Sequence, residues 1–339
     1  MITPSVPIGD SGLRSSAIGL GCMGMSEFYG ERDDAQSMRT LERAFELGVT
    51  HYDTSNVYGR GHNEELVGRF LKGKRDRVLL ASKFGVVRDP DGPPGSTYDR
   101  GIDNSPGYMR RCCEESLARL GIDTIDLYYV HRTDPDVPIE DTMHALAQLV
   151  QQGKIRAIGL SEVTAGQLRR AHRVHPVAAI QSEYSLWTRE PELDVLPACR
   201  ELGVTFVAYS PLGRGFLTGA IASAQSLAAD DFRLSSPRFQ VDNFDRNLAL
   251  IEHLRGLCAQ RGCTPGQIAL AWLMGREQPV LPIPGTKRIS YLEENVGAAQ
   301  VTLSAQERAG LEALLPIGAA AGTRYDPGFK GAPRPASAG

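Results

Sequence analysis

The stretch that decides the fold is residues 125–161, in which the segments 125–131 (IDLYYVH), 139–151 (IEDTMHALAQLVQ) and 155–161 (IRAIGLS) follow one another. The first and third segments are short apolar runs bounded by polar residues, which is typical of buried strands. The middle segment has the amphipathic pattern of a surface helix. A strand, a helix and a second strand in this order predict two parallel strands joined by a crossover helix.

The same alternation extends toward both ends of the chain. Further strands are predicted at residues 17–23, 49–53, 78–83, 177–181, 204–209 and 280–283, and further helices at 34–47, 63–71, 105–120, 164–173 and 192–202. Eight strands in regular alternation with helices favour an α/β fold, a single (β/α)8 TIM barrel. A β-hairpin turning at residues 9–12 is predicted before the first strand. The lack of a GxGxxG motif after that strand argues against a doubly wound sheet.

The chain divides into one domain and a tail. We expect the barrel to occupy residues 1–317, and residues 318–339, rich in Ala, Gly and Pro, to be mostly flexible beyond Arg324 and Tyr325. Two connections, residues 84–104 and 211–242, are longer than usual in such a fold. Both would lie on the C-terminal rim of the barrel, where they can cover a ligand.

Composition excludes several classes of function. The formal net charge of -3 over 339 residues, with an isoelectric point near 6.2, argues against a general nucleic-acid binder. No apolar run approaches the roughly 20 residues that a membrane helix needs. The six cysteines show no CxxC or CxxH metal spacing, and no signal peptide precedes them. We therefore expect a soluble cytoplasmic protein with reduced thiols.

Four polar residues fall at or just after the ends of predicted strands: Asp53, Tyr58, Lys83 and His131. Singly, each has an ordinary structural explanation, such as a turn, packing or a solvated charge. Together they can act as an acid–base site, because an ammonium beside a phenol stabilises tyrosinate and a carboxylate balances the ammonium. An imidazole can orient a carbonyl oxygen. The set suits carbonyl reduction or alcohol oxidation but holds no electron source, so a cofactor must carry the hydride.

Several separated motifs agree with this constellation. They are residues 53–59 (DTSNVYG), 82–85 (SKFG), 159–161 (GLS), 181–187 (QSEYSLW), 208–215 (AYSPLGRG) and 283–288 (IPGTKR). In this order the motifs resemble those of the aldo-keto reductases, over residues 20–296. The bacterial, yeast and plant subgroup that includes pyridoxal reductase and perakine reductase is the most similar.

The resemblance implies an enzyme that uses NADPH (NADP+) to reduce a small-molecule aldehyde or ketone to an alcohol. Tyr58 would be the general acid, and Lys83 would lower its pKa. Asp53 would pair with Lys83, and His131 would position the substrate carbonyl. Monomer and homo-oligomer both remain open.

The resemblance also implies a dinucleotide site. Ser161 and Gln181 would contact the nicotinamide carboxamide, and Tyr209 would stack on the ring. The remaining contacts would come from Ser210, Leu212 and Arg214 at the pyrophosphate and from Gly285, Thr286, Lys287, Arg288, Glu294 and Asn295 at the adenosine end. Many family members have Asn where this chain has Glu162, so the second polar contact of the carboxamide is not assigned.

The basic pair Lys287-Arg288 also has a physical interpretation of its own. A predicted helix follows the pair, and backbone N–H groups at a helix N-terminus favour an anion. A lysine and an arginine add charge and a guanidinium fork. Surface statistics alone favour a solvated pair, but the position after the last strand favours the 2′-phosphate of NADPH. Glu293 is expected to face solvent.

Apolar side chains near the rim are candidates for the substrate pocket. They are Met23, Phe28, Tyr29, Phe84 and Trp187. An apolar pocket around a polar tetrad would accept aldehydes and ketones broadly. The alternative is that about half of these residues pack under loops.

Two other functions compete with the reductase. A metal-dependent barrel hydrolase would need further ligands beside His51 and Asp53, but no second histidine cluster occurs at a strand end, so we expect no metal. A slow-turnover NADPH-binding redox sensor, resembling the β subunits of potassium channels, would keep the cofactor site.

Overall fold

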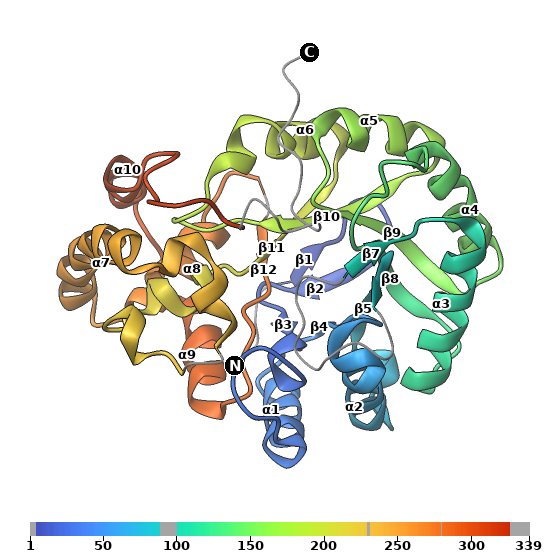
Figure 1. The fold of residues 1–339 in the computed structure, drawn as a ribbon, viewed down its shortest axis with the longest axis horizontal. Helices are drawn as coiled ribbons and strands as arrows, with labels where there is room; N and C mark the ends of the chain where they lie inside the picture. Colours follow the sequence, from blue (N-terminus) through green and yellow to red (C-terminus); the bar gives the residue numbers. More distant parts are fainter. Residues whose placement is uncertain (1–4, 89–99, 229–230, 279, 326–339) are drawn as a thin grey trace.

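Eight parallel strands form one barrel in the computed structural model, which describes residues 5–88, 100–228, 231–278 and 280–325 (Figure 1). In barrel order the strands are β3 (Leu20–Gly21), β4 (His51–Asp53), β5 (Leu79–Phe84), β8 (Ile125–Val130), β9 (Ile155–Ser161), β10 (Val177–Glu183), β11 (Thr205–Tyr209) and β12 (Val280–Pro282). The barrel closes because Gly19 N donates to Pro282 O at 3.0 Å and Gly21 N to Pro284 O at 3.3 Å. The predicted TIM barrel is confirmed.

Helices surround the barrel, and local sequence explains where they begin and end. They are α1 (Asp34–Glu46), α2 (His62–Leu71), α3 (Pro106–Leu120), α4 (Ile139–Gln151), α5 (Ala165–Val174), α6 (Val195–Leu202), α7 (Val241–Arg261), α8 (Pro265–Met274), α9 (Ile289–Gly297) and α10 (Ala305–Leu314). For example, α3 has Ser105 as its N-cap, Pro106 in its first turn and Gly121 in a left-handed C-terminal turn. Helix α7 and helix α10 pack together at one side of the barrel (Figure 1).

Short 3₁₀ helices connect these elements. They are η1 (Met23–Met25), η2 (Tyr58–Gly61), η3 (Arg75–Arg77), η4 (Glu190–Leu193), η5 (Gly213–Thr218), η6 (Ala224–Ser226), η7 (Phe232–Ser235), η8 (Pro237–Phe239) and η9 (Ala298–Gln300). Four of them, η5 to η8, occupy the long connection after β11. This connection is therefore folded into turns rather than irregular throughout.

Side chains alternate between the inside of the barrel and the helix layer. Leu79 and Ala81 of β5 belong to the inner apolar cluster, whereas Leu80 and Phe84 belong to the outer cluster beneath the helices. This alternation follows from the two-residue repeat of a strand. It decides which polar residues at the strand ends point into the barrel mouth.

The N-terminal hairpin closes the bottom of the barrel. Strands β1 (Ser5–Pro7) and β2 (Arg14–Ser16) pair antiparallel, and Ile8 and Leu13 between them pack into the inner cluster. Gly9 has φ +50°, and a Cβ there would lie 2.7 Å from Ala178 O. The predicted hairpin is confirmed, and the close approach explains the glycine.

The structure corrects two boundaries. The first barrel strand is only Leu20–Gly21 instead of residues 17–23, because its partner segment contains Pro282 and Pro284, which have no N–H for a longer ladder. The predicted loop 84–104 contains a second hairpin, β6 (Val86–Arg88) paired with β7 (Arg100–Ile102). Residues 89–99 lie outside the described part of the chain.

The segment after α10 returns to the barrel. Ala321 N donates to Asn247 Oδ1 of α7 at 2.8 Å, and Asn247 Nδ2 donates back to Ala321 O at 3.1 Å. The predicted mobility concerns residues 326–339, which lie outside the described residues. The domain division therefore stays a prediction.

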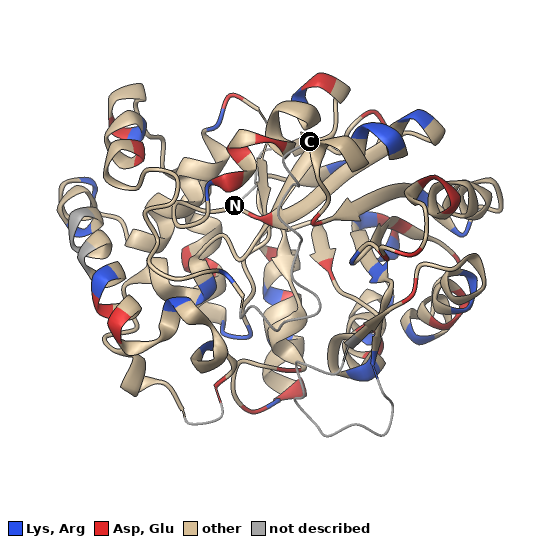
Figure 2. Ribbon diagram, turned by 45° about the horizontal axis from the view of Figure 1, so that its top comes forward, with Lys and Arg blue, Asp and Glu red and all other residues tan. Residues whose placement is uncertain are grey.

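Charges are mixed on the outside of the molecule. Lys and Arg alternate with Asp and Glu over the outer helices (Figure 2). Among the helices that the structure describes, none has both the length and the apolar character to cross a bilayer. All six cysteines are free thiols, and five of them are buried.

Gly159 on β9 is predicted to be essential for barrel packing. A Cβ at this position would lie 2.3 Å from the ring of Tyr129 on β8, which is fully buried among the side chains of the inner cluster. Gly159→Ala should destabilise the fold by about 1–3 kcal/mol, measured by urea unfolding. Gly107→Ala on α3, with no atom within 4 Å of its Cβ, is the control and should be close to neutral. Equal effects of the two substitutions would contradict this packing argument.

Candidate active site

The strand alternation brings polar residues together at the C-terminal mouth of the barrel. Asp53 ends β4, Lys83 lies near the end of β5, and His131 directly follows β8. Lys83 and His131 are two residues from Ala81 and Tyr129 of the inner cluster, and Asp53 is next to Tyr52 of the outer cluster. All three therefore point inward. Tyr58 reaches the same place from the start of η2. The structure therefore assembles the four predicted catalytic residues.

Lys83 is the centre of this group. Its Nζ donates to Asp53 Oδ1, to Thr54 O at 2.8 Å and to the Tyr58 hydroxyl oxygen at 3.2 Å. The side chain is 0% exposed, and Tyr58 is only 9% exposed. Because an ammonium only donates, Tyr58 must accept this bond and keeps its own hydrogen for another acceptor.

Burial and charge act in opposite directions on the two titrating groups. Burial raises the pKa of Tyr58 above its usual value, and the charge of Lys83 offsets part of that rise. Burial lowers the pKa of Lys83, but attraction to Asp53 and Tyr58 more than reverses this, so it lies above the usual value. The Lys83 charge thus acts in the predicted direction, but the pKa of Tyr58 still lies above its usual value, so the phenol is protonated at neutral pH. The catalytic role of the pair stays a prediction.

His131 lies against the ring of Tyr58. Their ring centroids are 5.8 Å apart, with the planes at 85°. Its Nδ1 is 3.2 Å from Ser55 Oγ, which fixes the orientation of the imidazole. This arrangement holds the imidazole at the mouth of the barrel beside the phenol.

Two predicted nicotinamide contacts adjoin the tetrad. Gln181 on β10 donates from Nε2 to Asp53 Oδ2 at 2.7 Å. Ser161 at the end of β9 accepts from Arg132 Nη1 at 3.3 Å. Tyr209, at the end of β11, pairs in register with Glu183. Ser161, Gln181 and Tyr209 therefore lie at inward-facing positions of neighbouring strands, next to the tetrad.

The segment 210–215 contains several residues with positive φ. Ser210 and Arg214 have φ of +47° and +57°, a region that non-glycine residues rarely adopt. Leu212, with φ -101°, precedes Gly213, with φ +57°. Such a change of sign between neighbouring residues is typical of N–H groups that line an anion-binding concavity. The observation agrees with the predicted pyrophosphate contacts, which stay predictions.

Lys287 and Arg288 lie together at the start of α9. Arg288 is the N-cap residue of this helix, and Lys287 Nζ donates to the carbonyl oxygens of Glu31 and Gly30. Burial and the neighbouring Arg288 lower the pKa of Lys287. Two cations beside a helix N-terminus repel each other, and an anion would relieve this repulsion.

The other residues predicted at the adenosine end lie around the same helix. Thr286 Oγ1 accepts from Arg288 N at 3.0 Å, and Gly285 bridges Gly21 across the closure of the barrel. Glu294 Oε1 accepts from Thr264 Oγ1 at 2.6 Å. Asn295 is buried. Glu293 is exposed, as expected, and pairs with Arg43 at 2.8 Å.

The residues predicted to line the substrate pocket do not all pack against the same neighbours. Met23 packs against Tyr58 and its apolar neighbours, and Phe28 contacts Phe232 from the loop after β11, with centroids 5.1 Å apart. Trp187 is buried and stacks on Phe216 at 4.1 Å. The substrate role of all three stays a prediction.

The prediction for Phe84 is wrong. Phe84 lies on the face of β5 opposite to Lys83 and stacks on Tyr128 at 5.3 Å in the helix-facing core. Neighbouring residues of a strand point to opposite sides, so a residue next to Lys83 cannot share its pocket.

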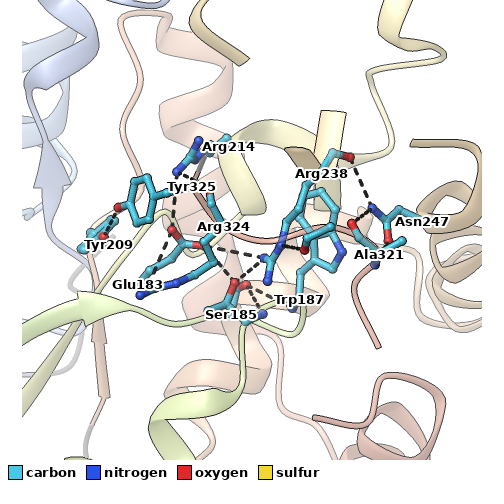
Figure 3. A network of polar contacts seen from close by, with 12 residues as sticks. Glu183, Ser185, Trp187, Tyr209, Arg214, Arg238, Asn247, Ala321, Arg324 and Tyr325 are labelled. Atoms are coloured by element: carbon cyan, nitrogen blue, oxygen red, sulfur yellow. Dashed lines mark hydrogen bonds and ion pairs between the residues drawn. The ribbon is translucent and has the colours of Figure 1, made fainter. Parts of the chain in front are cut away.

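Sequence reasoning missed a polar network beside Tyr209. The side chains of Glu162 and Glu183 are both buried; Arg324 pairs with both, and Arg214 faces Glu183. Tyr325 joins the network through its hydroxyl, which lies 2.8 Å from that of Tyr209. Figure 3 shows Arg214, Arg324 and Tyr325 gathered around Glu183 and Tyr209. The sequence signal was Glu162 itself, because a carboxylate in place of an amide needs a counter-charge.

The metal-dependent hydrolase considered above would need a cluster of metal ligands. Within residues 5–88, 100–228, 231–278 and 280–325, no three His, Cys, Asp or Glu side chains group closely enough to hold a metal ion. His51 lies one strand period below Asp53, fully buried inside the barrel. Burial lowers its pKa to about 4, so it is neutral in the folded protein at neutral pH.

The buried His51 predicts a pH dependence of stability. The unfolded chain protonates this histidine below about pH 6.5, whereas the folded chain does so only near pH 4. Stability should therefore fall as the pH drops from 6.5 toward 4. His51→Gln should reduce this slope by about one proton, or about 1.4 kcal/mol per pH unit, in urea unfolding measured at several pH values. Between pH 7 and 8 the two slopes should coincide. An unchanged slope below pH 6.5 would contradict the assignment.

Comparisons with known proteins agree with this geometry. The model of the Aldo/keto reductase family matches residues 17–316. The chain is 45% identical over 317 residues to aldo-keto reductase yakc of Schizosaccharomyces pombe, whose name specifies NADP(+), with 92% of each chain covered.

Solved structures give the same result. A glycerol dehydrogenase from Gluconobacter oxydans has a TM-score of 0.85 at 30% identity, covering 96% of this chain and 99% of its own. An aldo/keto reductase from Klebsiella pneumoniae, solved with NADP and acetate, has a TM-score of 0.71 at 28% identity, with 96% and 99% covered. The subgroup suggested by the motifs stays a prediction. The chain belongs to the aldo/keto reductase family.

Proposed function

We propose that the protein is an NADPH-dependent oxidoreductase that reduces aldehydes or ketones to alcohols. The observation that carries the proposal is the Lys83 ammonium, buried between Asp53 and the Tyr58 hydroxyl, which accepts from Nζ at 3.2 Å. Membership of the family and the naming of NADP in two relatives support the choice of reaction and cofactor.

The residues of the chain provide the proton and its control. The Tyr58 hydroxyl hydrogen, not used by Lys83, is available to a carbonyl oxygen in the barrel mouth. As negative charge develops on that oxygen, Tyr58 donates its proton and Lys83 stabilises the tyrosinate. Asp53, held by Gln181, keeps Lys83 in place. His131, oriented by Ser55, is placed to hold the carbonyl.

The residues present fit the cofactor. Ser161, Gln181 and Tyr209 lie at the inward ends of three successive strands beside the tetrad. The strained loop with Arg214 suits a pyrophosphate, and the repelling pair Lys287 and Arg288 suits a 2′-phosphate. When bound, NADPH supplies the hydride that the protein's own side chains cannot.

Tyr58→Phe tests the proton-transfer role. The variant should keep NADPH binding, measured by fluorescence titration. Its turnover of 4-nitrobenzaldehyde should fall by roughly 10²–10⁴-fold, the usual contribution of a general acid. Turnover like that of the wild type would refute the role of Tyr58. A wild type that binds NADPH but shows no measurable turnover of the aldehyde would instead support the redox-sensor alternative.

Replacement of both Lys287 and Arg288 by Ala tests the phosphate assignment. The dissociation constant for NADPH should rise by about tenfold or more, as expected for the loss of charged hydrogen bonds. NADH, which has no 2′-phosphate, is the control ligand and should be affected much less. Equal weakening of the two dinucleotides would contradict the assignment.

A further inference from the structure

The C-terminal segment 320–325 reaches the nicotinamide end of the proposed site. Its backbone is held by Asn247 of α7 and by Arg238, whose Nε donates to Gly322 O at 3.3 Å. A Cβ at Gly322 would lie 2.9 Å from the backbone of Pro237, and φ there is +85°. The segment is thus fitted closely against the loop after β11 and delivers Arg324 and Tyr325 to the barrel mouth (Figure 3).

Arg324 is the counter-charge of Glu162. Its Nη1 donates to Glu162 Oε1 at 3.2 Å and its Nη2 to Oε2 at 3.0 Å. Glu162 Oε1 also accepts from Glu183 N at 2.9 Å. The Glu162 side chain is 4% exposed, and a carboxylate buried to this extent is strongly unfavourable without a cation. An asparagine at this position would need no such partner.

Tyr325 extends the network to Tyr209. The Tyr209 hydroxyl donates to Glu162 Oε1 at 2.7 Å and lies 2.8 Å from the Tyr325 hydroxyl. Since Tyr209 has already used its hydrogen, Tyr325 must be the donor of the second bond. Arg214 lies over the Tyr325 ring at 5.3 Å. The tail therefore joins the end of β9, the end of β11 and the strained loop.

We propose that Arg324 and Tyr325 are positioning residues of the dinucleotide site, fixing Glu162 and the Tyr209 ring where the nicotinamide half binds. This inference rests on the proposed function. Arg324 keeps the Glu162 carboxylate paired, and Glu162 and Tyr325 together hold the Tyr209 phenol. Among the described residues, the polar contacts given above for α9 and for this network share no residue.

A matched pair of truncations tests the proposal. One chain ends after Tyr325 and the other after Thr323, so they differ only in Arg324 and Tyr325. Fluorescence titration measures binding of NADPH and of adenosine 2′,5′-bisphosphate, which lacks the nicotinamide half. The shorter chain should bind NADPH about tenfold more weakly than the longer one, the scale of a lost charged hydrogen bond. Their affinities for the bisphosphate should agree within about twofold.

Point variants separate positioning from folding. Arg324→Met should weaken NADPH like the shorter truncation, and Arg324→Lys should recover part of the loss. Adding Glu162→Gln to Arg324→Met should recover affinity, because it removes the unpaired carboxylate. A purely structural tail would weaken NADPH and the bisphosphate equally, and this result would overturn the proposal.

The two proposals fail in different ways. Unchanged NADPH affinity in Arg324→Met would overturn this inference and leave the proposed function intact. A wild type that binds no NADPH would overturn both.

Discussion

The buried ammonium of Lys83 is the constraint on which the site depends. Moving such a charge out of water costs several kcal/mol unless acceptors surround it, and the structure supplies the Asp53 carboxylate, the Thr54 carbonyl and the Tyr58 hydroxyl. These acceptors fix the phenol oxygen relative to the barrel, and Gln181 fixes Asp53 in turn. Burial outweighs the Lys83 charge, so the pKa of Tyr58 stays above its usual value and the phenol keeps its proton at neutral pH.

Most of the fold could be predicted from local sequence pattern, because each βα unit repeats an apolar run followed by an amphipathic run. The predicted bounds of α4 and β9 match those observed, Ile139–Gln151 and Ile155–Ser161, since amphipathic and apolar runs are unambiguous there. The meeting of Asp53, Lys83 and His131 was also predictable, because all three lie at or next to the ends of neighbouring strands. Phe84 was assigned to the pocket because it follows Lys83 in the sequence. Strand alternation instead places the two side chains on opposite faces of β5. The β6–β7 hairpin was missed because its pairing joins segments across a long connection.

The tail was not predictable for a different reason. Glu162 signalled that a cation must lie nearby, but the sequence holds 37 lysines and arginines and does not say which one comes close. Arg324 is separated from Glu162 by 162 residues. This contact depends on the tertiary structure. The chain returns to the barrel after α10, and a hydrogen bond to Asn247 holds it there. Local propensity describes elements well and says little about such contacts.

Backbone strain and buried charge occur together at the ends of β9 and β11. Glu162, Ser210 and Arg214 all have positive φ, a conformation that costs roughly 1–3 kcal/mol per residue and persists only where neighbouring contacts enforce it. The Glu162 side chain provides such contacts through its four hydrogen bonds. Arg214 instead faces Glu183 at 3.7 Å, beyond hydrogen-bond range. Arg214 Nη2 also donates to Arg324 O at 3.5 Å, and its guanidinium lies over the Tyr325 ring at 5.3 Å. The C-terminal segment therefore contacts both Glu162 and Arg214, two of the residues whose backbone has positive φ, and helps to hold their side chains in place.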